Sequence, residues 1–138
     1  MGTPLHAGTS ASTTRGWLHW VLFLIGLVTI LAGAVQMIAP EFILGIVGAE
    51  TSPTAGYCFG IVGMFMVLFG GVLTHGLRST PPQPQLILWA ALQKFGAAIA
   101  ISIGVQRGIF AALALSIAAF DFLSGILGIW YLKRLDVH

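Results

Sequence analysis

The sequence predicts an all-α integral membrane protein with four transmembrane helices in an antiparallel bundle. Hydrophobic residues make up 57% of its 138 residues and charged residues only 7%, whereas soluble domains carry about a quarter charged residues. The apolar residues also form four long runs, and a bilayer core about 30 Å thick needs roughly 20 apolar residues per helical crossing. We therefore expect one membrane domain over residues 1–138. Its net charge of +2 is small and dispersed, so nucleic acid is not an expected partner.

The helix boundaries follow from prolines, glycines and polar residues. A polar tail, residues 1–15, precedes the first helix, which Pro40 ends. Ser52-Pro53 is a start signal for the second helix, and a turn at Arg107-Gly108 should separate the third from the fourth. These signals predict helices at about 17–39, 55–75, 85–106 and 108–132. The first loop, residues 40–54, is rich in apolar residues, so we expect it to lie along the membrane surface or against the bundle.

The basic residues predict the orientation of the bundle. With four crossings both chain ends share one side, and that side carries four of the basic residues: Arg15, Arg78, Lys133 and Arg134. The opposite loops carry only Arg107. An excess of basic residues marks the cytoplasmic face. We therefore expect both termini inside the cell (N-in/C-in) and a multi-pass protein of the inner (plasma) membrane.

Two opposite charges are expected to meet inside the membrane. Lys94 lies about 13 Å from the cytoplasmic end of the third helix, and Asp121 about 16 Å from that of the fourth, at 1.5 Å per residue. Neighbouring antiparallel helices would bring them to one level. Because an unpaired charge at that depth costs about 3 kcal/mol or more, we predict an ion pair, with Gln93 and Ser124 as supporting polar residues. The pair is either a structural lock or a proton- or substrate-coupled site.

Two histidines are candidate ligands. His19 and His75 both fall at the cytoplasmic ends of their helices, and imidazole can bind haem iron or a chlorophyll magnesium. The alternative is a pair of interfacial histidines that meet lipid headgroups. The single cysteine, Cys58, excludes an internal disulfide. No catalytic motif or metal motif is apparent, so we expect neither a catalytic residue nor a metal site, and the chain is not expected to be an enzyme.

The layout resembles the DoxX-like group of small four-helix bacterial membrane proteins. The features that carry this resemblance are the Ala39-Pro40 end of the first helix, the glycine-spaced run GIVGMFMVLFGG (residues 60–71) and the short later connections. The resemblance is one of topology. It implies a bacterial inner-membrane bundle that is associated with other membrane proteins or with redox and quinone metabolism, and it transfers no site residue.

Three functions are compatible with these features. The first is a non-catalytic accessory subunit, or a lipid- or quinone-binding bundle, of a membrane assembly. The second is a small dimeric proton-coupled transporter that uses Lys94 and Asp121. The third is a haem- or pigment-binding subunit that uses His19 or His75. In each case the expected partners are membrane lipid and other membrane proteins or further copies of the chain.

Overall fold

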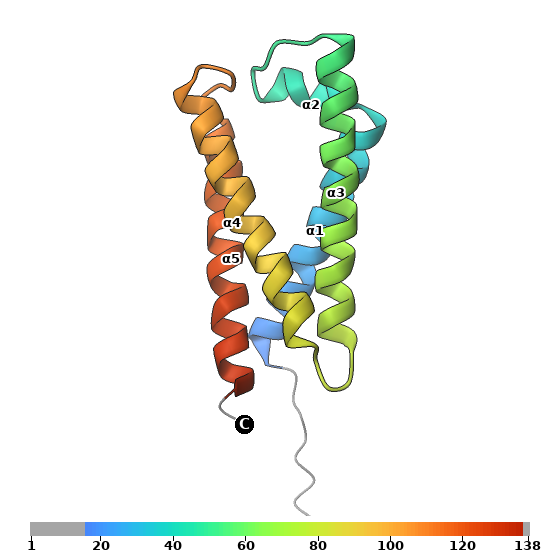
Figure 1. The fold of residues 1–138 in the computed structure, drawn as a ribbon, viewed down its shortest axis with the longest axis vertical. Helices are drawn as coiled ribbons and strands as arrows, with labels where there is room; N and C mark the ends of the chain where they lie inside the picture. Colours follow the sequence, from blue (N-terminus) through green and yellow to red (C-terminus); the bar gives the residue numbers. More distant parts are fainter. Residues whose placement is uncertain (1–15, 137–138) are drawn as a thin grey trace, which may run out of the picture.

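A computed structural model describes residues 16–136 as an all-helical protein (Figure 1). Its helices are α1 (Trp17–Ile38), α2 (Pro40–Ile46), α3 (Pro53–Arg78), α4 (Pro84–Gln106) and α5 (Ala114–Asp136). α1, α3, α4 and α5 are long and apolar enough to cross a membrane. The four predicted crossings are thus confirmed by length and composition. The predicted polar tail, residues 1–15, lies outside the described residues.

Proline and serine determine where two of the crossings begin. α3 starts at Pro53, and the preceding Ser52 hydroxyl accepts a hydrogen bond of 3.1 Å from the Ala55 N–H. α4 starts at Pro84. Proline is well suited to the first helical position because its missing N–H would have no partner there, and serine is a preferred N-cap. The observed bounds of α1, α3 and α4 lie within three residues of the bounds that the sequence predicts.

The fourth crossing, which we expect at about 108–132, begins six residues later and ends four residues later in the structure. Gly108 has a φ of +71°, which a right-handed helix cannot contain. The N–H groups of Ile109 and Phe110 both donate to the Gly104 carbonyl, so the chain folds back over the end of α4. α5 consequently begins at Ala114 and runs to Asp136. Residues 109–113 are mostly apolar, which is why their composition alone suggested a helix.

The loop between the first two crossings contains α2 and is packed against the protein. Leu44 and Val47 are each only 4% exposed. The Ala111 N–H donates a 2.7 Å hydrogen bond to the Val47 carbonyl, which joins this loop to the α4–α5 turn. Of the two predicted placements, the one against the bundle is therefore the one observed.

The four long helices form two antiparallel pairs, α1 with α3 and α4 with α5 (Figure 1). Glycines bring α1 and α3 close together: a methyl group on Gly33 would lie 2.6 Å from the Gly63 carbonyl oxygen, and one on Gly70 would lie 2.8 Å from that of Gly26. Small residues permit such approach between membrane helices. The pairs contact each other through α3 with α4 and through α1 with α5.

Among residues 16–136, the largest cluster of buried apolar residues between the two pairs lies at one end of the molecule. We call this the basic end, because Arg78, Lys133 and Arg134 lie there, and the opposite end the α2 end. The buried core cluster draws on α1, α3 and α4: Leu18, Leu22, Ile25, Leu73, Leu77, Ile87 and Ala90. All of these residues lie toward the basic end of their helices. Toward the α2 end the two pairs lie further apart (Figure 1).

Candidate functional site

The predicted intramembrane ion pair is present. Lys94 Nζ on α4 donates a hydrogen bond of 2.7 Å to Asp121 Oδ1 on α5. The two side chains are only 6% and 10% exposed. Two formal charges inside an apolar helix pair require each other, because either one alone would be left uncompensated in a medium of low dielectric constant. The antiparallel register of α4 and α5 brings the two residues together.

The groups around this ion pair differ from the expected support. Lys94 Nζ also lies 5.4 Å from the centroid of the Phe120 ring, within the range of a cation–π contact. The Ser124 hydroxyl donates to the Phe120 carbonyl at 2.7 Å. Gln93 Oε1 is buried and has no hydrogen-bond partner among the described residues. Within residues 16–136, the Lys94–Asp121 contact is the one hydrogen bond that either charged side chain makes.

The two candidate histidines have different surroundings. His19 is 2% exposed, and its Nδ1 lies 3.1 Å from the Tyr131 hydroxyl on α5. His75 is exposed in the last turn of α3. Tyr131 was not expected as a partner of His19. The only sequence signal was that both residues fall at the same membrane level, and level alone does not select a partner.

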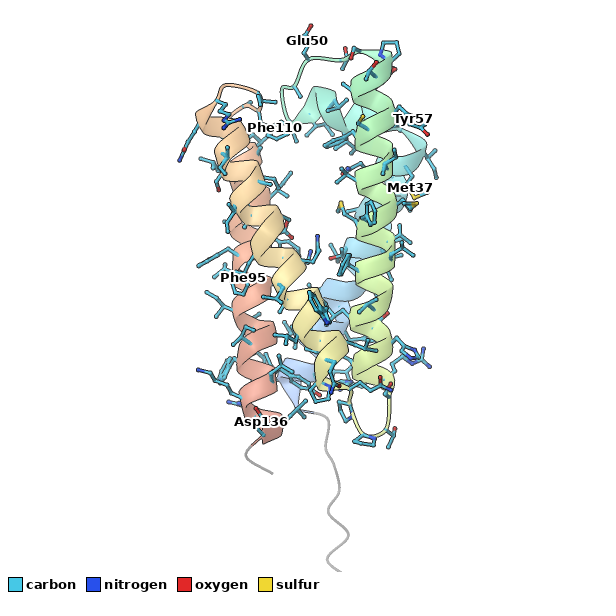
Figure 2. All side chains as sticks on the ribbon, in the orientation of Figure 1. Met37, Glu50, Tyr57, Phe95, Phe110 and Asp136 are labelled. Atoms are coloured by element: carbon cyan, nitrogen blue, oxygen red, sulfur yellow. The ribbon has the colours of Figure 1, made fainter. Side chains whose placement is uncertain are left out.

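A pocket between the two helix pairs lies at the α2 end. Its volume is about 590 Å³, and α2, α3 and the α4–α5 turn all contribute to its lining. The lining residues used below are Leu44, Glu50, Cys58, Val62, Ile109 and Phe110. Figure 2 shows Phe110 beside the α2 loop, whereas Tyr57 points away from the α4–α5 pair. No sequence feature predicted this pocket, because its size depends on how far the two helix pairs separate.

A second hollow lies on the other side of α3. It is an open groove of about 860 Å³ lined by the end of α1, the start of α2 and the first turns of α3, including Met37, Glu41 and Tyr57. Tyr57 is 73% exposed. In a bilayer this groove would face lipid, because it lies outside the contact between the two pairs.

The polar contacts described at these sites are hydrogen bonds, the Lys94–Asp121 ion pair and a cation–π contact. Across residues 16–136, no group of three or more His, Cys, Asp or Glu side chains is placed to hold a metal ion. Comparison of the chain with family models, with curated proteins and with solved structures finds no match. The four-helix layout behind the DoxX-like resemblance is present, but no family is identified. The chain is a small multi-pass membrane protein by the composition of its helices.

Proposed function

We propose that this protein is a non-catalytic bundle that binds a bilayer-resident apolar molecule, a lipid or a quinone, between its two helix pairs. It would do so as an accessory component of a larger membrane assembly. The observation that carries the proposal is the one-sided core. The buried cluster joins the pairs toward the basic end; toward the α2 end they lie further apart (Figure 1), and there α2, α3 and the α4–α5 turn line the pocket of about 590 Å³.

Burial in the α2 half supports this proposal. The buried residues of α1 and α3 in that half include Gly33, Gln36 and Gly63, which lie against one another within the α1–α3 pair. On α4 and α5, Gly104 is packed under the Phe110 ring of its own turn. These residues pack within their own pair, and the α2 loop meets the α4–α5 turn at Val47 and Ala111, so another apolar molecule could bind between that contact and the core cluster. The pocket of about 590 Å³ lies in this region and is within the size range of small-molecule sites.

Orientation and location form part of the same proposal. Arg78, Lys133 and Arg134 lie at the basic end, and the positive-inside rule places that end in the cytoplasm. The α2 end would then face the outer leaflet of a bacterial inner membrane. Arg15, which contributed to this prediction, lies outside the described residues.

The single cysteine provides the test. Cys58 is exposed in the structure of the chain alone and lines the inter-pair pocket. We expect its rate of alkylation by N-ethylmaleimide to fall several-fold when delipidated protein in detergent receives dioleoyl phosphatidylethanolamine or a decyl-substituted benzoquinone. The physical reason is that a bound apolar molecule excludes both water and reagent from the thiol.

A matched control separates pocket binding from general coating by lipid. In a Cys58→Ser/Tyr57→Cys variant the thiol moves by one residue to the outward groove, at nearly the same depth. The rate at this position should change much less than the rate at Cys58. Equal protection at both positions, or no protection at either, contradicts the proposal. Protection by only one of the two additives identifies the class of ligand.

A further inference from the structure

The ion pair and its neighbour leave hydrogen-bonding capacity unused. An ammonium group has three N–H donors, and Lys94 donates one of them to Asp121. Gln93 Oε1 is a buried acceptor with no partner among the described residues. Buried polar atoms are nearly always paired, and leaving one unpaired is costly. This part of α4 therefore holds a donor and a buried acceptor whose hydrogen bonds are not satisfied within residues 16–136.

These atoms lie where the inter-pair core ends. Ile87 and Ala90 of α4 belong to the core cluster, and Lys94 follows Ala90 by four positions, so it lies on the same face of the helix one turn nearer the α2 end. On α5, Phe120 touches the same ammonium group and is 41% exposed. Along the chain, Lys94 thus lies between the core residues of α4 at the basic end and the part of the pocket lining that follows α4, Gly108 to Phe110.

Charge restricts what can bind there. Lys94 and Asp121 together are neutral, so an anionic or cationic headgroup would add a charge with no counter-ion at this depth. A ketone or ester oxygen could accept from Lys94 but could not donate to Gln93 Oε1. A hydroxyl group both accepts and donates, so it is the neutral head that can accept from Lys94 and also donate to Gln93 Oε1.

We propose that Gln93 and the Lys94–Asp121 pair bind the hydroxyl head of a neutral amphiphile whose apolar chain extends between the helix pairs toward α2. Long-chain alcohols, isoprenoid alcohols and quinols share this chemistry. The inference rests on the proposed function, because it places the head of the molecule that was proposed to bind between the pairs. It adds the chemical class of the head and the residues that select it.

Three probes that share the same alkyl chain length and differ in their head groups test which head the site selects. Hexadecanol, palmitate and hexadecyltrimethylammonium, each with a diazirine close to the head, are photolysed at pH 8 with the full-length protein in nanodiscs. The labelled residues are mapped by mass spectrometry. Hexadecanol should label Phe120 at several times the yield of either charged probe. The reference position is Leu31, which is 66% exposed on α1 and should not discriminate between the heads.

Substitutions locate the head. Gln93→Leu should weaken competition by unlabelled hexadecanol about fivefold, as expected for the loss of one neutral hydrogen bond. Gln106→Leu makes the same change at an exposed position near the end of α4 and should have no effect. The neutral Lys94→Met/Asp121→Leu variant should keep labelling by the chain but lose the preference for hexadecanol.

The outcomes distinguish the two proposals. If no probe labels Phe120 above the level of Leu31, no head group lies beside Lys94 and this inference is overturned, and the Cys58 protection experiment then decides whether a molecule binds nearer α2. If all three probes label Phe120 equally and Gln93→Leu changes nothing, a molecule binds there but its head is not selected by these residues. That second result overturns this inference and leaves the proposed function standing.

Discussion

The two helix pairs are held together by different kinds of contact. α1 and α3 approach so closely that backbone meets backbone, at Gly33 with Gly63 and at Gly26 with Gly70. α4 and α5 are joined by the buried Lys94–Asp121 ion pair. There the glycine contact is with a side chain, since a methyl group on Gly125 would meet the Phe95 ring at 2.9 Å.

Both kinds of contact are suited to helices that are surrounded by lipid. Lipid is as apolar as leucine, so hydrophobicity does not drive membrane helices together, and close packing or polar contacts must do so. The α1–α3 pair depends on shape, which tolerates no added atom at the contact. The α4–α5 pair depends also on charge, which does not tolerate the loss of one partner. Substitutions that remove a charge from one pair or add a methyl group to the other test this distinction.

The largest effect is expected from removing one charge of the α4–α5 pair. Asp121→Leu leaves Lys94 buried without its counter-ion and should destabilise the protein by about 3–5 kcal/mol. SDS-induced unfolding in mixed micelles measures this loss. The Lys94→Met/Asp121→Leu variant removes both charges and should recover most of the stability, because no unpaired charge remains.

The double variant also separates a structural lock from a transport site. A structural lock requires only that the helices stay together. The folded double variant should therefore still bind an apolar molecule between the pairs, although it should lose the preference for a hydroxyl head. If it instead abolishes a proton-coupled flux that the unmodified protein supports in liposomes, the pair is a coupling site. A double variant as unstable as Asp121→Leu would contradict the charge-pairing argument itself.

A smaller but still substantial effect is expected in the α1–α3 pair. Gly33→Ala places a methyl group 2.6 Å from the Gly63 carbonyl oxygen and 2.9 Å from the Val67 nitrogen. Both neighbours are backbone atoms, so the helices must move apart, at about 1–3 kcal/mol in the same unfolding assay. Gly71→Ala is the control, because a methyl group there has no atom within 4 Å. Equal stability of the two variants would show that the close approach contributes little.

The smallest effect concerns the contact between the two pairs at the basic end. Tyr131→Phe removes the hydroxyl that lies 3.1 Å from His19 Nδ1 and keeps the ring. We expect a loss of about 0.5–1 kcal/mol, typical of one polar contact between membrane helices. Tyr57→Phe changes an exposed tyrosine and should be neutral in the same measurement. If Tyr57→Phe lost as much stability as Tyr131→Phe, the His19–Tyr131 contact would not be what stabilises the two pairs against each other.

Much of the fold and one site could be predicted from the residues alone. Bilayer thickness converts an apolar run into a crossing, so the four long helices follow from the sequence. The meeting of Lys94 and Asp121 follows as well, because a charge in an apolar run must find its opposite, and depth on antiparallel helices is a simple count of residues.

The rest depended on how the helices are arranged in space. The late start of α5 comes from the Gly108 turn folding back on Gly104, and the His19–Tyr131 contact from the meeting of α1 with α5. The pocket at the α2 end depends on where the two pairs separate. The sequence determined which segments cross the membrane, because that depends on the composition of each helix alone. Only the tertiary structure decided which faces meet, because in lipid that choice depends on the fit between helices.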